Sequence, residues 1–323
     1  MAERPYLQRE WPLEQQKDYI RKLPLWQSPI TLEPLPGGIQ NRNFVAQDGN
    51  TKYVVRVAGD LLNIGGVLSS TNAAVEVASA CGVSPKLVYQ EPVLSVVEWI
   101  NGRNLTIEDF TRRETIAPVV DLIKRLQAAS ETVRWAMVFF DPFFQTRQSA
   151  RMCAHLKARG HEAYTPLVTV LERLERHFGP FKPVLAHCDL AYVNTMLDVS
   201  GRYWLIDYDL AGLGPPEWDI AELAGYSYTS DEIDREFVRC YFGDGSEAEV
   251  ERHVLRHRAY KITSLIRVIY LLLILDASCG VSAEELKASM GKNFENVGGD
   301  YLEFARTHYE FFRKEWARYG DTF

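Results

Sequence analysis

The sequence contains few cysteines and no arrangement that would pair them. Its 323 residues include five cysteines, an odd number, and no C-x-x-C motif. A disulfide framework is therefore not indicated, and scattered thiols are typical of a protein in a reducing, cytosolic compartment. The positions are Cys81, Cys153, Cys188, Cys240 and Cys279.

A block of cationic residues is also missing. The chain has 36 Lys and Arg against 43 Asp and Glu, a formal net charge of −7. This balance argues against a nucleic-acid partner, which would require a basic patch. An anionic polyphosphate can still bind, because a few local cations, helix N-termini and magnesium set the field at a site. At 46% hydrophobic residues, the chain can bury a large core and form two lobes.

Long hydrophobic runs are absent as well. The N-terminal segment MAERPYLQREWPLEQQKDY is too polar to be a signal peptide. The longest apolar run, LIRVIYLLLIL at 265–275, is too short to span a membrane and contains Arg267. We expect this run to be a buried helix. The sequence thus indicates a cytoplasmic protein without membrane attachment, and it leaves the oligomeric state open.

The chain does contain a set of polar residues in the order that phosphoryl transfer requires. His187, Asp189 and Asn194 follow the spacing H-x-D-x-x-x-x-N, and a later apolar run leads into Asp207 and Asp209. The reaction needs a carboxylate to orient the attacking hydroxyl, and an amide and a carboxylate to hold magnesium on the phosphates. Asp189, Asn194 and Asp207 are these three groups in the order of kinase catalytic loops.

The context of these residues supports the same interpretation. An apolar VLA precedes the first motif, and a short turn, DVSGR, separates two strand-like runs before Asp207. Asp209 is a weaker candidate for the metal, in a shared or outer role. The alternative is a β-hairpin that carries acids at its ends without catalytic meaning.

The N-terminal part alternates in the manner of β-strands between residues 30 and 57. Gly37 and Gly38 end one alternating segment, and Asp48-Gly49 is a hairpin signal before the next. A glycine turn lets backbone N–H groups approach phosphate closely, because no Cβ intervenes. The alternative is an ordinary hairpin with flexible glycines.

Together these segments resemble the choline/ethanolamine kinase and aminoglycoside phosphotransferase family, and in particular its bacterial choline-kinase-like branch. The similarity runs from about Leu32 to about Tyr309 and includes FFDPFF at 139–144. It implies an α+β protein-kinase-like fold, with a five-stranded antiparallel N-lobe that carries one helix and a mostly helical C-lobe. The implied boundaries are 1–100 for the nucleotide-binding lobe and 101–323 for the catalytic and acceptor-binding lobe. The implied cofactors are ATP and Mg²⁺.

On the nucleotide side, the family pattern GG-x-[ST]-N-x-x-[FY] matches GGIQNRNF, with Gln40 in place of the hydroxyl residue. The resemblance therefore assigns the phosphates to Gly37, Gly38, Asn41 and Asn43. Arg56 takes the position of the kinase strand lysine and can grip two phosphate oxygens.

Such a strand cation normally pairs with a glutamate of the next helix. That helix is expected over 71–81, and no glutamate stands at 70–72, so Glu76 is the substitute we expect. Glu98, Trp99 and Ile100 follow the strand that leads into the hinge, and the resemblance makes their main chain the adenine-binding edge. The alternative is a simple linker between the lobes.

On the acceptor side, the aromatic cage of choline kinases is incomplete. Leu210 stands where the family has an aromatic residue, Arg267 matches a tryptophan position, and Tyr270 matches the second tryptophan. Tyr301 remains near the end of the chain, and Tyr226 is the further substrate candidate. Because a quaternary ammonium needs aromatic walls, choline is a poor fit. Arg267 can face an anionic or hydroxyl-rich acceptor or an acidic neighbour, or can be a helix-surface arginine.

The resemblance also assigns the remaining roles. Asp189, beside His187, orients and deprotonates the acceptor hydroxyl, while Asp219 accepts hydrogen bonds from the backbone of the catalytic loop. The sequence thus predicts transfer of the ATP γ-phosphate to a hydroxyl of a small molecule, an amino alcohol, polyol or amino sugar. The alternative is a pseudokinase or binding module without turnover, favoured by Gln40 and the missing helix glutamate.

Overall fold

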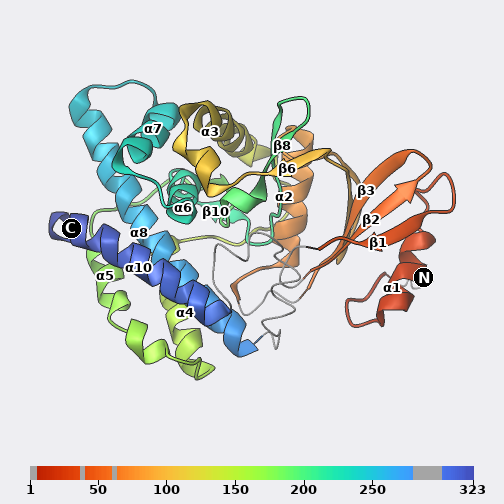
Figure 1. Ribbon diagram of the computed structural model, residues 1–323, viewed down its shortest axis with the longest axis horizontal. Helices are drawn as coiled ribbons and strands as arrows, with labels where there is room; N and C mark the ends of the chain where they lie inside the picture. The colour runs from red at the N-terminus through yellow and green to blue at the C-terminus, as the bar shows by residue number, and fades with distance from the viewer. Residues whose placement is uncertain (1–5, 37–40, 60–63, 279–299) are drawn as a thin grey trace.

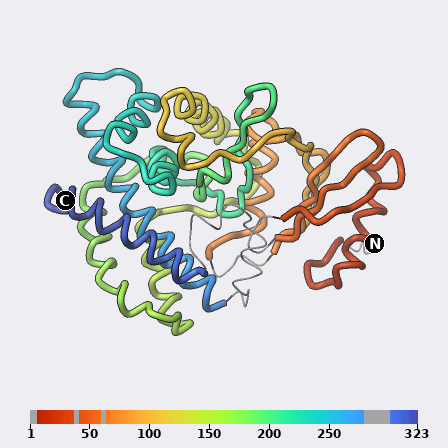
Figure 2. Tube along the Cα trace, viewed as in Figure 1, coloured from red at the N-terminus to blue at the C-terminus, as the bar shows by residue number. Residues whose placement is uncertain are grey.

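A computed structural model describes residues 6–36, 41–59, 64–278 and 300–323. Figure 1 shows a twisted sheet at one end of the long axis and a cluster of helices at the other. The ends of the chain lie at these opposite ends, as the red and blue traces show in Figure 2. This is the two-part α+β architecture expected from the sequence.

The first part is a five-stranded sheet with one helix packed against it and one at the N-terminus. The strand order is β1-β2-β3-β5-β4, and every neighbouring pair is antiparallel, which confirms the predicted sheet. Its elements are α1 (Leu13–Arg21), β1 (Thr31–Pro34), β2 (Arg42–Asp48), β3 (Thr51–Val57), α2 (Leu68–Ala80), β4 (Leu87–Glu91) and β5 (Leu94–Glu98).

Alternation and turn chemistry explain the central hairpin of this sheet. Phe44 and Ala46 of β2 and Val55 and Val57 of β3 are buried at every second position, as a half-buried strand requires. Gly49 lies at the turn with φ +57°, a left-handed conformation that glycine adopts without steric cost. The Asp48-Gly49 signal therefore marks the turn that the structure has.

Short strands connect the sheet to the helices and carry the loops of the site. They form a three-stranded sheet in the order β6-β8-β9 and a pair β10-β7. These strands are β6 (Gly102–Asn104), β7 (Val184–Ala186), β8 (Thr195–Asp198), β9 (Tyr203–Leu205) and β10 (Gly212–Gly214).

The second part is built around one long buried helix, α8 (Glu247–Ser278), which packs against α4, α6 and α10 (Figure 1). Residues 265–275 of α8 are all buried, as expected from their apolar run. None of the helices in the described part of the chain is long and apolar enough to cross a membrane. The other helices are α3 (Arg113–Ala128), α4 (Pro142–His155), α5 (Leu167–Glu175), α6 (Trp218–Tyr226), α7 (Asp231–Phe242) and α10 (Tyr301–Tyr319).

Candidate active site

The loop that follows β7 is held by two acids on one face of α6. Asp219 Oδ2 accepts a hydrogen bond from the backbone N of His187 at 2.9 Å, and its Oδ1 accepts from the backbone N of Cys188 at 3.1 Å. Glu222 Oε2 accepts from the backbone N of Leu190 at 2.9 Å. Residues three apart on a helix share a face, so α6 presents both carboxylates to the loop. Asp219 thus makes the contacts that the resemblance implied.

Cys188 shows why the loop needs such support. Its φ is +59°, a left-handed conformation that costs a non-glycine residue about 1–3 kcal/mol. The thiol is buried, and burial raises its pKa well above the ordinary value. This thiol is therefore a small packed group rather than a nucleophile.

Glu222 is a residue of the site that the sequence interpretation missed. It is fully buried, and its Oε1 accepts a hydrogen bond from Arg267 Nη1 at 2.7 Å. Burial raises the pKa of Glu222, and the Arg267 guanidinium opposes that rise. Its position three residues after Asp219 on the same helix was the signal available in the sequence.

Asp189 lies at the centre of the arrangement. Its carboxylate Oδ1 accepts a hydrogen bond from the Tyr226 hydroxyl at 3.1 Å, and its carbonyl oxygen accepts one from Asn194 Nδ2 at 2.8 Å. Burial raises the pKa of Asp189, while the nearby positive charge of Arg267 and the Tyr226 hydrogen bond lower it. A carboxylate with a raised pKa is better suited to accept a proton from an alcohol.

His187 joins the loop to the strand that follows it. Its ring Nε2 lies 2.9 Å from the carbonyl oxygen of Ile206, the residue before Asp207. The backbone N of Ile206 in turn donates to the carbonyl oxygen of Asn194 at 2.9 Å. The β8–β9 register, Thr195 opposite Leu205, therefore places Asn194 opposite Ile206, the residue that precedes Asp207.

Asp207 has the properties of a metal ligand. Its φ is +67°, and its buried Oδ1 accepts no hydrogen bond from the residues that the structure describes. An amide oxygen and a carboxylate oxygen are ligands that Mg²⁺ prefers, with phosphate and water completing the octahedron. Within the described ranges, no three His, Cys, Asp or Glu side chains gather as a metal cluster.

Asp209 is occupied by other partners. Its Oδ2 accepts a hydrogen bond from Asn41 Nδ2 at 2.7 Å, and its Oδ1 is in contact with the Arg56 guanidinium. Arg56 Nη2 lies 4.0 Å from Asp207 Oδ1. Asp209 therefore orients Arg56 and Asn41, and its carboxylate is less accessible to a metal than that of Asp207.

The pairing of Glu76 with Arg56 is wrong. Glu76 accepts a hydrogen bond from Trp135 Nε1 at 3.0 Å, and Arg56 pairs with Asp209 instead. Thr71 lies on the side of α2 that meets Asp209, since its Oγ1 donates to the Asp209 carbonyl oxygen at 3.2 Å. Five residues further along a helix, a side chain is rotated by about 140°, so Glu76 points elsewhere.

The remaining residues predicted to contact the phosphates come from the segment between β1 and β2 and from β2 itself. Gly37 and Gly38 lie outside the described residues. Asn41 Oδ1 accepts a hydrogen bond from the backbone N of Gly59 at 3.0 Å, which ties the start of β2 to the end of β3. Asn43 lies opposite Arg56 in the β2–β3 register.

The hinge segment forms one wall of a hollow. Glu98, Trp99 and Ile100 line it together with Lys86 and residues 198–200. The backbone N–H groups of Glu98 and Trp99 donate to the carbonyls of Lys86 and Lys52 at 2.9 and 3.2 Å. The N–H of Ile100 has no such partner among the described residues, so of these three donors it alone is available to a ligand.

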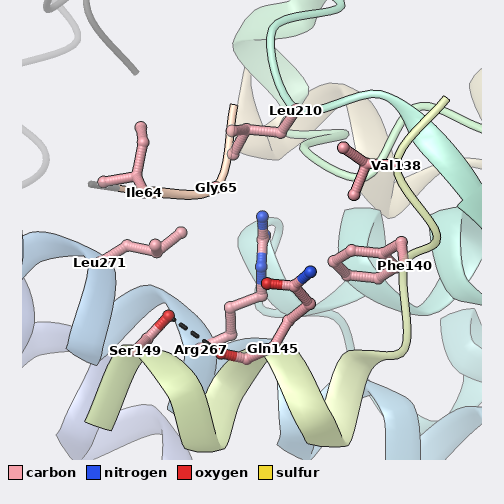
Figure 3. A pocket seen from close by; sticks show the side chains of 9 residues that line it. All are labelled: Ile64, Gly65, Val138, Phe140, Gln145, Ser149, Leu210, Arg267 and Leu271. Atoms are coloured by element: carbon pink, nitrogen blue, oxygen red, sulfur yellow. Dashed lines mark hydrogen bonds between the residues drawn. The ribbon is translucent and has the colours of Figure 1, made fainter. Parts of the chain in front are cut away.

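A second hollow brings together two positions that the sequence singled out, Leu210 and Arg267. Figure 3 shows Arg267 rising from α8 with Gln145 and Ser149 from α4, while Leu210 and Ile64 lie across the hollow. Arg267 is 3% exposed, so it is not a surface arginine, and its acidic neighbour is Glu222. This hollow is the candidate acceptor pocket.

Two other substrate predictions are wrong in this structure. Tyr270 is buried in the helical core, and its hydroxyl donates to the carbonyl of Tyr164 at 2.7 Å. Tyr301 begins α10 and is 4% exposed in the same core. Neither residue lines the pocket. Tyr226 contacts Asp189 and therefore does belong to the site.

Comparison with known proteins points to one family. Residues 31–255 match the model of a phosphotransferase enzyme family. A choline/ethanolamine kinase family protein from Mesorhizobium loti has a similar structure, with 19% identity, TM-score 0.70 and coverage of 94% of both chains. LicA, a choline kinase from Streptococcus pneumoniae, has in its complex with AMP 20% identity and TM-score 0.67, over 95% of this chain and 98% of that one.

The spectinomycin phosphotransferase APH(9)-Ia, in complex with ADP and spectinomycin, is similar at 14% identity and TM-score 0.53, over 88% of this chain and 94% of that one. At these identities the likeness concerns the fold, which is the kinase-like fold expected from the sequence.

Proposed function

Because this chain belongs to the phosphotransferase enzyme family, we propose that it is an ATP- and magnesium-dependent kinase that phosphorylates a hydroxyl group of a small molecule. The observation that carries the proposal is the convergence of Asp189, Asn194 and Asp207. The loop after β7 and the strand pair β8–β9 bring together a carboxylate with a raised pKa, an amide, and a second carboxylate whose Oδ1 accepts no hydrogen bond from the described residues. These are the groups that phosphoryl transfer requires.

In this mechanism Asp189 accepts the proton of the acceptor hydroxyl as the hydroxyl oxygen attacks the γ-phosphorus of ATP. The bond between that phosphorus and the oxygen bridging to the β-phosphate breaks, and ADP leaves. Tyr226 holds the Asp189 carboxylate by its hydrogen bond, and Asn194 fixes the loop through the Asp189 carbonyl. Asn194 Oδ1 and Asp207 would hold magnesium, which when bound would neutralise charge on the phosphates. Arg56, oriented by Asp209 and Asn41, supplies a further positive charge beside them.

The nucleotide occupies the region between the two parts of the chain, which we divide into lobes at residues 100 and 101. The free N–H of Ile100 is the donor we assign to adenine. Similar structures that hold AMP and ADP support an adenine nucleotide as the phosphate donor. The acceptor hydroxyl enters from the hollow lined by Leu210 and Arg267.

A second candidate is a nucleotide-binding protein without turnover. The absence of an Arg56–Glu76 pair is the observation that favours it, because protein kinases use such a pair to position the strand cation. Asp209 supplies the carboxylate instead, so the site retains a means of orienting Arg56. We therefore prefer the enzyme.

Turnover separates the two candidates. ADP release from Mg-ATP would be measured with and without a panel of alcohols, for the native protein and Asp189→Ala. We expect acceptor-stimulated turnover that Asp189→Ala lowers by roughly a hundredfold or more, with nucleotide affinity little changed. Saturable Mg-ATP binding, with no acceptor that stimulates ADP release, would support the second candidate, a nucleotide-binding protein without turnover.

A further inference from the structure

The acceptor pocket has a lining whose chemistry restricts what it can hold. Nine described residues form it: Ile64, Gly65, Val138, Phe140, Gln145, Ser149, Leu210, Arg267 and Leu271. Six of them are apolar or glycine, and none carries a carboxylate. The polar groups are an amide, a hydroxyl and a guanidinium, which come from the two helices α4 and α8 (Figure 3).

An ammonium group would find only uncharged hydrogen-bond acceptors in this lining. The lining lacks a negative charge, and Phe140 is its one aromatic residue. The guanidinium of Arg267 already lies over that ring, with Cζ 5.3 Å from the ring centroid, at cation–π distance. A cationic acceptor would therefore approach a fixed cation without an aromatic face to receive it.

An anionic group gains little from Arg267 for a different reason. The guanidinium is already paired with Glu222 Oε1 at 2.7 Å. Burial raises the pKa of Glu222, but both of its oxygens accept hydrogen bonds from N–H groups, those of Arg267 and Leu190, and this favours the charged carboxylate. Asp189 is a second nearby negative charge that acts on Arg267. Because a paired cation has its field largely cancelled at a distance, an added carboxylate or phosphate would meet about as much repulsion as attraction. The pocket is thus close to neutral although it contains an arginine.

Hydrogen-bonding groups remain for a neutral ligand. The side-chain amide of Gln145 has no hydrogen-bond partner among the described residues, and it offers both a donor and an acceptor. Gly65, with φ +88°, brings its backbone close to this amide, since a Cβ there would lie 3.6 Å from Gln145 Oε1. Ser149 donates to the carbonyl of Gln145 at 3.1 Å and keeps its oxygen as an acceptor.

We propose that a neutral acceptor with several hydroxyl groups, a polyol or sugar, lies over the mouth of this hollow, and that Gln145 and Arg267 bind hydroxyls that do not react. The hollow itself has a volume of about 10 Å³, enough for about one hydroxyl group. This inference rests on the proposed kinase function. A hydroxyl can accept from the guanidinium and both donate to and accept from the amide, whereas an ammonium can only donate and a carboxylate can only accept.

The first test compares size-matched acceptors with Mg-ATP. The panel contains glycerol, erythritol and a small sugar as neutral acceptors, glycerate as the anion, and ethanolamine and choline as cations. We expect the best neutral acceptor to exceed the best charged one in kcat/KM by roughly tenfold or more, as a site built for hydroxyls should. A higher value for choline, ethanolamine or glycerate would overturn the proposal.

The second test uses two glutamines of one helix. Gln145→Leu should lower kcat/KM for the neutral acceptor by about tenfold, mainly through KM, because a bound hydroxyl loses its partner. Gln148→Leu is the matched control, since Gln148 lies on α4 outside the lining, and it should leave kcat/KM unchanged. Equal effects of the two substitutions would overturn the role of Gln145.

The third test removes the charge that compensates Arg267. Glu222→Gln should lower overall turnover, because Glu222 also holds the catalytic loop, but it should raise the glycerate-to-glycerol ratio of kcat/KM by several-fold. An unchanged ratio would mean that pairing with Glu222 does not set the charge preference, and would contradict the proposal.

Direct binding separates failure of this inference from failure of the proposed function. Calorimetry would measure glycerol and erythritol binding in the presence of ADP and magnesium, for the native protein and Gln145→Leu. Polyol binding that depends on Gln145, without any phosphate transfer, would support the proposed pocket and contradict the proposed kinase function. Transfer to choline that Gln145→Leu does not affect would keep the kinase and reject the pocket.

Discussion

The hydroxyl of Tyr226 donates a hydrogen bond to the carboxylate of Asp189, with 3.1 Å between Oη and Oδ1. Tyr226 is the last residue of α6, the same helix whose Asp219 and Glu222 hold the backbone on either side of Asp189. One helix therefore fixes both the position of the proposed base and its hydrogen bonding. Burial raises the pKa of Tyr226 well above its ordinary value, so the group remains a donor at any working pH.

We predict that Tyr226→Phe shifts the acidic limb of the kcat/KM profile to higher pH. The hydrogen bond favours the charged form of Asp189 and lowers its pKa, so its removal raises that pKa and the base becomes protonated at a higher pH. The pH–rate profile measures the shift. Tyr228→Phe is the control, because the Tyr228 hydroxyl is near His308 and not Asp189; a limb that moves equally in both variants would contradict the prediction.

Asp207→Asn and Asp209→Asn should differ in their metal dependence. Asp207 presents a free carboxylate oxygen, whereas both oxygens of Asp209 have protein partners. Replacing a charged ligand of magnesium by an amide weakens metal binding. Asp207→Asn should therefore reduce nucleotide affinity only when magnesium is present. Asp209→Asn should weaken binding with and without magnesium, because Arg56 loses its partner. Titration of nucleotide at several magnesium concentrations checks this. Identical metal dependence in both variants would contradict the assignment of Asp207, rather than Asp209, as the magnesium ligand.

Asp219→Ala should destabilise the protein. The substitution leaves the buried N–H groups of His187 and Cys188 without their acceptor, and each unsatisfied group costs about 1–3 kcal/mol. We expect the free energy of unfolding to fall by about 2–4 kcal/mol in urea titrations. Asp121→Ala, at an exposed position of α3, should change it by less than about 0.5 kcal/mol. Similar losses in both variants would contradict the role assigned to Asp219.

His308 should make the stability depend on pH. Burial lowers its pKa to about 4 from the ordinary 6.5, so between these values the unfolded chain binds a proton that the folded chain does not. The free energy of unfolding therefore has its full value above pH 6.5 and decreases as the pH falls toward 4, by about 3 kcal/mol in total.

His308→Gln should flatten this dependence, and the urea midpoint at pH 7 and pH 4.5 measures it. The exposed His155→Gln provides the control. If both variants lose stability on acidification as steeply as the native protein, His308 is not responsible.

The parts of the site that depend on local order were predictable from the sequence. The spacing from His187 to Asn194 and the apolar run before Asp207 define a loop and a hairpin, and hairpin register follows from the turn between the strands. The structure accordingly pairs Asn194 with Ile206, the residue before Asp207, through that register.

Contacts between helices were not predictable in the same way. The side of α8 that faces the pocket depends on how α8 packs against α4 and α6, and residues 265–275 are buried on all sides. The periodicity therefore could not distinguish Tyr270, which is in the core, from Arg267, which lines the pocket. The predicted pair of Arg56 and Glu76 was wrong for a related reason, since the partner of Arg56 comes from a distant segment of the chain.

Asp209 touches three segments that precede it by well over a hundred residues: Asn41 at the start of β2, Arg56 on β3, and Thr71 on α2. These bonds cross between the sheet and the helical part of the chain. Separating the two parts would break all of them at once, two of them to a single carboxylate. Any movement that separates the two parts therefore has to break the Arg56–Asp209 ion pair and the Asn41 hydrogen bond together. Because salt screens charges, this movement should be faster at high ionic strength than at low.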